Sequence, residues 1–183
     1  MRRPLLITAF GPFGGRTVNA SALALGDLRR RNPAIRIRIL PVDLVEAPRR
    51  LHAAIRLVSP RAILLLGEAA GAKCLRIESI SWNQMDFDVP DVAGRQPRKL
   101  PIDPAAPQHL ETPIDGVGLQ RRLHEAGHPT ELSTDPGRYL CNRIYFAALH
   151  RGDVPALFVH LPLERDLPTP QAAAALELIA AAL

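Results

Sequence analysis

Ala62-Ile63-Leu64-Leu65-Leu66, which ends at Gly67, is a continuous apolar run without polar alternation. Leu5-Leu6-Ile7-Thr8-Ala9-Phe10 is a similar run and ends at Gly11-Pro12. Short apolar runs that end at turn residues are typical of strands buried on both faces. Such strands occur in parallel sheets that helices cover on both sides. The two runs therefore predict an α/β fold.

The rest of the chain alternates between helix and strand signals. Asn19-Ala20-Ser21 can cap a helix that continues to about Arg31, and Arg36–Leu40 alternates like a half-exposed strand. A Pro- and Asp-rich segment at about 89–113 is expected to form a long, mobile surface loop within a single domain over residues 1–183. The remaining predictions are helices at about 44–58, 116–126, 139–150 and near the C-terminus, and strands at 75–82, 130–133 and 157–162.

The composition limits the classes of protein to which the chain can belong. Its 183 residues suffice for one domain with a sizeable core, and 47% hydrophobic residues argue against disorder. The net charge of +5 comes from scattered arginines whose short runs fit solvated helix faces, so no nucleic-acid partner is expected. The sequence shows no apolar run of about 18 residues and no signal peptide, which indicates a cytoplasmic protein without a membrane partner.

Two cysteines make no disulfide framework, and one of them, Cys141, occupies a position that favours a thiolate. It falls in the first turn of the helix expected from 139, near unpaired N–H groups and the positive end of the helix dipole. His160 lies near the C-terminal end of the last expected strand, where sites form in such sheets. A cysteine hydrolase needs this arrangement, although a buried structural cysteine and a core histidine would give the same pattern.

Four ordered blocks resemble the pyroglutamyl peptidase type I (pyrrolidone-carboxylate peptidase) family of cysteine peptidases. They are Phe10–Gly15 followed by Asn19, Gly67–Asp91, Ser133–Asn142 and Phe158–Pro162. The resemblance implies a twisted, mostly parallel (mixed) sheet with helices on both faces, and a homo-oligomer, either a dimer or a tetramer. It also implies a thiol peptidase that removes N-terminal pyroglutamyl residues from peptides through a thioester acyl-enzyme, without a metal or other cofactor.

The resemblance also assigns roles to residues. Cys141 would be the nucleophile, His160 the general base and then acid, and Glu78 the carboxylate that orients the imidazole. A pyroglutamyl residue is a flat, neutral lactam, so an aromatic slot with a few hydrogen bonds suits it. The developing oxyanion would lie at the N-terminus of the Cys141 helix. The residues implied to contact the substrate are Phe10, Phe13, Asn19, Glu68, Val89 and Leu140.

Three positions depart from the family pattern: Glu68 replaces a usual glutamine, and Ala72 and Asp88 replace usual arginines. Asp88 reverses a charge, and we expect its carboxylate to point into the site and oppose thiolate formation. Arg76 or Arg138 could restore the missing positive charge. If these departures remove turnover, the chain is instead an altered, inactive family member that binds a lactam-like or acyl ligand.

A metal site is the other alternative. His124-Glu125-Ala126-Gly127-His128 matches the zinc-protease pattern, which requires both histidines on one continuous helix. Gly127 and Pro129 disfavour a helix at the second histidine, so we expect no metal site there. Cys74 has no histidine near it in the sequence and is expected to be a packed, neutral thiol.

Overall fold

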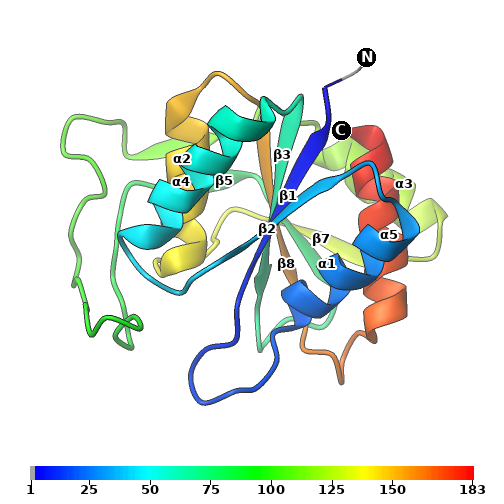
Figure 1. Ribbon diagram of the computed structural model, residues 1–183, viewed down its shortest axis with the longest axis horizontal. Helices are drawn as coiled ribbons and strands as arrows, with labels where there is room; N and C mark the ends of the chain where they lie inside the picture. The colour runs from blue at the N-terminus through cyan, green and yellow to red at the C-terminus, as the bar shows by residue number, and fades with distance from the viewer. Residues whose placement is uncertain (1–2) are drawn as a thin grey trace.

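A six-stranded sheet forms the centre of the computed structural model, which describes residues 3–183 (Figure 1). Its strand order is β2-β1-β3-β8-β4-β7, and neighbouring strands are parallel except β8 and β4, which are antiparallel. The predicted mostly parallel, mixed sheet is therefore confirmed. Its strands are β1 (Leu5–Phe10), β2 (Arg36–Leu40), β3 (Ala62–Glu68), β4 (Leu75–Glu78), β7 (Thr130–Ser133) and β8 (Ala156–Leu161).

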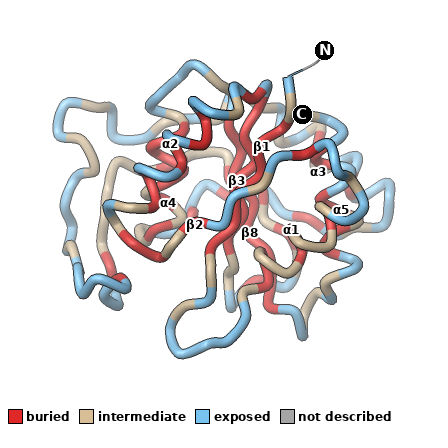
Figure 2. The backbone as a smooth tube through the Cα atoms, viewed as in Figure 1, coloured by how far each residue is buried: buried red, intermediate tan, exposed pale blue. Residues whose placement is uncertain are grey.

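Helices cover both faces of the sheet, and the buried strands lie between them (Figure 2). Alternate residues of β1 show the division, because Ile7 packs on the side of α1, α3 and α5, whereas Leu6 packs on the side of α2 and α4. Every helix within residues 3–183 is too short or too polar to cross a membrane. The helices are α1 (Ala20–Arg31), α2 (Glu46–Val58), α3 (Gly116–Glu125), α4 (Leu140–Arg151) and α5 (Thr169–Ala182).

The strand predicted at 75–82 is in fact two strands in two sheets. After β4 ends, β5 (Ile80–Trp82) pairs in antiparallel orientation with β6 (His109–Glu111). The break falls at Ser79, whose N–H donates to the carbonyl of Ser133 at 2.7 Å. The single-strand prediction is wrong because the alternation of apolar residues continues through a change of pairing partner.

The segment at 89–113, expected to be irregular, contains β6 and is held by polar side chains. The buried carboxylate of Asp91 accepts a hydrogen bond from the N–H of Leu44 at 2.8 Å, just before α2 begins. Further along, the Asn83 side chain accepts from the N–H of Asp103 at 2.9 Å and donates to its carbonyl at 2.7 Å. These bonds fasten the segment to the side of the sheet that carries α2 and α4.

Candidate active site

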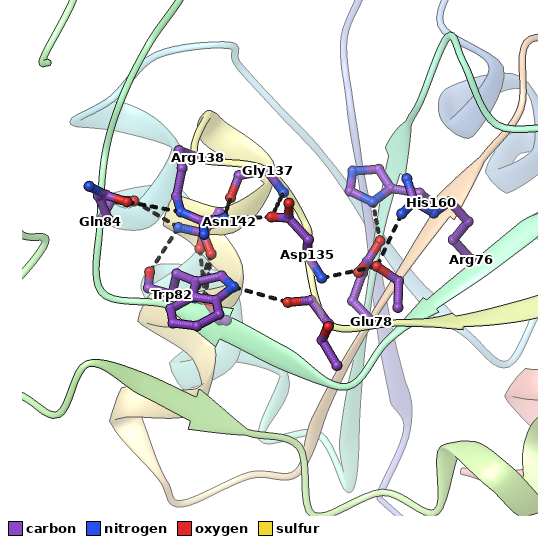
Figure 3. Close-up of polar contacts among 12 residues, drawn as sticks. Arg76, Glu78, Trp82, Gln84, Asp135, Gly137, Arg138, Asn142 and His160 are labelled. Atoms are coloured by element: carbon purple, nitrogen blue, oxygen red, sulfur yellow. Dashed lines mark hydrogen bonds and ion pairs between the residues drawn. The ribbon is translucent and has the colours of Figure 1, made fainter. Parts of the chain in front are cut away.

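Three side chains from three elements meet beside the C-terminal end of β8. Cys141 lies in the first turn of α4, His160 near the end of β8, and Glu78 at the end of β4. Nδ1 of His160 is 2.8 Å from Oε1 of Glu78, and the two side chains point toward one another (Figure 3). Cys141 lies near enough to the imidazole to raise its pKa. The structure thus brings together the three residues predicted to be catalytic.

Because the catalytic side chains are buried, the charge of each one depends on its neighbours. Glu78 is 0% exposed and His160 is 6% exposed. Burial alone would lower the pKa of His160, but Cys141 and the Glu78 carboxylate outweigh it and raise this pKa from 6.5 to about 9. The imidazole is therefore an imidazolium at neutral pH, held between Cys141 and the Glu78 carboxylate.

The N-terminus of α4 supplies backbone donors beside the thiol. The first hydrogen bond within this helix runs from the N–H of Arg143 to the carbonyl of Tyr139, at 3.1 Å. The N–H groups of Leu140, Cys141 and Asn142 precede that bond, so they need acceptors outside the helix backbone. Together with the helix dipole, these donors favour an anion at this position.

Asn142 fixes this end of α4 against the segment that follows β5. It is fully buried, and its side-chain oxygen accepts from the Ser81 hydroxyl (2.9 Å) and the Trp82 N–H (2.8 Å). Its side-chain nitrogen donates to the carbonyls of Trp82 (2.8 Å) and Gln84 (2.9 Å). Figure 3 shows this network, which uses the full hydrogen-bonding capacity of one amide. The residue next to Cys141 is therefore held rigidly.

Gly67 allows the close approach of the thiol to the sheet. A Cβ atom at this position would lie 2.8 Å from Sγ of Cys141 and 2.8 Å from the ring of Phe158. Gly67 is also the register partner of His160 between β3 and β8. The sequence marked this glycine as the end of a strand and the start of a family block, but not its contact with the thiol, which is made by a distant helix.

A cavity of about 260 Å³ opens next to Cys141. The prediction for Val89 needs correction: its side chain is 49% exposed and lies outside this cavity. In that part of the chain Phe87 is fully buried, whereas Val89 is half-exposed. The other residues predicted to contact the substrate all line the cavity: Phe10, Phe13, Asn19, Glu68 and Leu140.

Tyr139 is a wall of this cavity that the sequence analysis did not identify. Its ring centroid lies 5.7 Å from that of Phe13 and 4.4 Å from that of Phe87, and its hydroxyl donates to the carbonyl of Pro90 at 3.3 Å. Burial, together with Asp91 and Cys141, raises the pKa of the phenol to about 12, so it stays neutral. The helix predicted over 139–150 included Tyr139 as its first residue, whereas Tyr139 is the N-cap residue.

The family model described as pyroglutamyl peptidase matches residues 3–170 of this chain. The chain belongs to the pyroglutamyl peptidase family. The pyrrolidone-carboxylate peptidase of Yersinia pestis (strain Pestoides F) is 35% identical over 170 residues, which are 88% of this chain and 79% of the relative. The crystal structure of pyrrolidone carboxyl peptidase from Thermus thermophilus has a TM-score of 0.91 and 33% identity, over 98% of this chain and all of that one (100%). The enzyme from Thermococcus litoralis has a TM-score of 0.88 and 26% identity, over 96% and 90% of the two chains.

Glu68 is one of the departures from the family pattern, and a neighbouring cation neutralises the negative charge of its carboxylate. Its carboxylate oxygens lie 2.5 and 3.2 Å from the two terminal nitrogens of Arg16, which also lines the cavity. One of these oxygens also accepts from the N–H of Ala20 at 2.7 Å, at the start of α1. The extra negative charge therefore has both a cation and a helix N-terminus as partners. Arg16 was not predicted, because only the fold brings it to Glu68.

Asp88, the departure expected to disturb the thiolate, does not face the site. Its side chain is 95% exposed, and its nearest cationic partner is Arg98 at 3.9 Å. The expectation that it points inward is wrong because Phe87 fills the inward position, where it is 0% exposed.

The two arginines proposed as replacements for the missing positive charge are engaged elsewhere. Arg76 pairs with Glu131 at 2.7 Å, and Arg138 pairs with Asp135 at 2.5 Å. Ala72, the third departure, is buried, with 6% of its surface exposed. Charge in the substrate cavity is therefore supplied by Arg16 and Glu68.

The His124–His128 motif does not form the geometry of a zinc-protease helix. α3 ends at Glu125, and Gly127 adopts the left-handed conformation with a φ of +79°. Nε2 of His124 lies 2.7 Å from the carbonyl oxygen of Thr130. The two histidines are therefore not on one continuous helix, as the sequence predicted.

Proposed function

We propose that this chain cleaves the peptide bond after an N-terminal pyroglutamyl residue, with Cys141 as nucleophile, His160 as proton donor and acceptor, and Glu78 as the orienting carboxylate. The observation that carries the proposal is the contact of these three groups beside a small, aromatic cavity. Relatives named pyrrolidone-carboxylate peptidase support it. An inactive family member is not favoured, because Asp88 faces solvent and the charge of Glu68 is paired.

In the first half-reaction, the Cys141 thiolate attacks the acyl carbon of the pyroglutamyl residue and a C–S bond forms. The carbonyl oxygen becomes an oxyanion, which the free N–H groups at the start of α4 would stabilise. The His160 imidazolium then donates its proton to the leaving amine while the C–N bond breaks. A thioester on Cys141 and a neutral imidazole remain.

In the second half-reaction, neutral His160 removes a proton from water, and the oxygen of that water attacks the thioester carbon. The C–S bond breaks, pyroglutamic acid leaves and loses its carboxyl proton to the solvent, and the thiolate–imidazolium pair is restored. Glu78 accepts the hydrogen bond from Nδ1 throughout and so keeps Nε2 available to exchange protons with the reacting groups. Until the product leaves, every proton in this scheme moves between His160 and the substrate or water.

The cavity suits a neutral ring better than a charged amino terminus. Tyr139 and Phe13 contribute aromatic walls, and the charged pair Arg16–Glu68 is already satisfied within the protein. Asn19 is occupied as the N-cap of α1, where its oxygen accepts from the N–H of Ser21 at 3.0 Å. We therefore propose that Asn19 shapes the wall of the lactam pocket through this cap.

The setting proposed for the enzyme is a reducing cytoplasm, and the assembly proposed is a homo-oligomer. Both cysteines are free, and the proposed chemistry requires one of them to stay reduced. Exposed apolar side chains at Val45, Val89 and Val92 provide surface for a contact between copies. Analytical ultracentrifugation of the purified chain tests the oligomer.

The release of a fluorescent amine from a pyroglutamyl amide under reducing conditions tests the proposed activity. Cys141→Ala should abolish turnover, whereas Cys74→Ala should retain it, because Cys74 is a half-buried thiol whose pKa is raised by burial and by Glu131. Iodoacetamide should inactivate the wild type, and a chelator should not. Activity that survived in Cys141→Ala would reject the assignment of the nucleophile.

A further inference from the structure

A second cavity, of about 400 Å³, lies between α2, α4 and residues 102–104. The two helices pack side by side on one face of the sheet (Figure 1). Arg143 lines this cavity and follows Cys141 by two positions, which places it about 200° away around the helix axis. The second cavity therefore opens on the side of α4 opposite the thiol, and the proposed peptidase reaction does not use it.

Arg143 is unusual among the arginines of this chain. Within residues 3–183, it is the one arginine that is at least partly buried and has neither a hydrogen-bond nor an ion-pair partner for its side chain. Burial lowers the pKa of its guanidinium, and no neighbouring carboxylate opposes that effect. A half-buried cation without a partner is costly, so a group that neutralises it would bind with a gain in free energy.

The acidic residues beside the cavity lie against side chains other than Arg143. Asp103 lies 3.4 Å from Nε2 of His150, and Asp153 holds Arg151 through two contacts of 2.6 and 2.7 Å. Neither carboxylate reaches Arg143.

The remaining charges near this cavity are positive. Burial lowers the pKa of His52, a hydrogen bond with the Ala147 carbonyl opposes that effect, and Arg151, Arg143 and Arg56 lower it further. Three guanidinium groups thus act on one imidazole at the wall of the cavity. Of these three arginines, Arg143 is the one that lines the cavity without a partner in residues 3–183.

We propose that this cavity binds a small phosphate monoester, with the phosphate group on Arg143. A planar guanidinium donates two parallel hydrogen bonds to an oxyanion, and the imidazole of His150 can donate to a further oxygen. His52 forms part of the wall, because its Nε2 is already on the Ala147 carbonyl. A phosphate dianion has enough oxygens and charge for both kinds of donor, whereas the guanidinium alone would satisfy a carboxylate. Ile102 and Pro104 give the cavity an apolar wall for the organic part of the ester.

Titration calorimetry of the full chain with phenyl phosphate tests the site. We expect saturable binding to the wild type and at least tenfold weaker binding to Arg143→Gln. The matched control is Arg121→Gln, which removes an exposed arginine of α3 on the other face of the sheet and should change the affinity less than twofold. Arg143→Lys keeps the positive charge but loses the two parallel N–H donors of the guanidinium, so it should bind phenyl phosphate with intermediate affinity. This variant also tests the site if Arg143→Gln does not fold.

Two further ligands identify the group that is recognised. Inorganic phosphate should bind more weakly than phenyl phosphate and lose affinity in the same variant, because it lacks the apolar part. If inorganic phosphate and phenyl phosphate bind with equal affinity, the site recognises the phosphate group alone and its ligand is free phosphate. Tighter binding of benzoate than of phenyl phosphate would overturn the phosphate assignment. Equal affinities of wild type and Arg143→Gln, or no saturation at millimolar phenyl phosphate, would overturn the site itself.

Discussion

The two cavities beside α4 differ in how their charges are balanced. Next to Cys141, Glu78 pairs with His160 and Glu68 pairs with Arg16, so the protein neutralises its own charges. On the opposite side of the same helix, Arg143 has no partner within residues 3–183. In a pocket for a neutral lactam, charged side chains must pair with one another, because the ligand has no charge that could neutralise them. In a pocket with an unpaired cation, an anionic ligand can neutralise that cation.

The largest expected effect comes from breaking the pair at the catalytic centre. Glu78→Gln should lower kcat by about 100-fold, because the imidazole loses its orienting carboxylate and part of the charge that keeps it protonated. The pKa of His160 should then fall from about 9, since burial would be opposed by Cys141 alone. Steady-state kinetics with the fluorogenic amide measures the first effect.

The same variant should change the pH dependence of stability. A His160 pKa raised from 6.5 to about 9 stabilises the fold fully below pH 6.5 and loses that contribution as the pH rises through 9. Urea unfolding across this window should show a smaller decline for Glu78→Gln than for the wild type. An identical decline in both proteins would contradict the charged pair.

A larger side chain at Gly67, which lies against the Cys141 thiol, should have the next largest effect on activity. Gly67→Ala places a Cβ 2.8 Å from Sγ of Cys141, so the thiol must shift from its position beside His160. We expect kcat to fall by about 10- to 100-fold, with about 1–3 kcal/mol lost from the free energy of unfolding. Gly26→Ala, where no atom lies within 4 Å of the new Cβ, is the control and should keep full activity.

The pairing of charges in the substrate pocket predicts a non-additive pair of variants. Arg16→Gln leaves Glu68 without its cation and should raise KM by about tenfold, because the lactam would then meet an uncompensated carboxylate. Adding Glu68→Gln to this variant should restore most of the lost affinity. A double variant as poor as Arg16→Gln alone would show that Arg16 contacts the substrate directly.

The smallest effect is expected at Asp88. Because its side chain is 95% exposed, Asp88→Arg should change neither kcat/KM nor the pH profile of iodoacetamide alkylation by more than about twofold. A large increase in thiol reactivity would mean that Asp88 reaches the catalytic pocket in solution.

The sequence predicted those features that depend on local patterns. Apolar runs located β1 and β3, and the position of Cys141 at the start of a helix and of His160 near the end of a strand followed from periodicity. The role of Glu78 came from family resemblance, because nothing local distinguishes this carboxylate from the other acidic residues. Its contact with His160 spans 82 positions in the chain.

The features that the sequence missed depend on residues meeting across the fold. The change of partner after Ser79 depends on the distant strand β6, and Gly67 is required by a thiol on another element. The pairing of Glu68 with Arg16 and the isolation of Arg143 likewise exist only after packing. No pattern of spacing or composition carries that information.

The position of β8 has a consequence for synthesis on the ribosome. This strand joins β3 to β4 in the middle of the sheet, yet it follows all the other strands along the chain. Until β8 leaves the exit tunnel, the growing polypeptide has two sheet fragments with unpaired inner edges, which can pair with other chains. His160 arrives on this same strand. Peptidase activity would therefore report that the last strand has been inserted, and a nascent chain stalled before it would be both inactive and prone to aggregation.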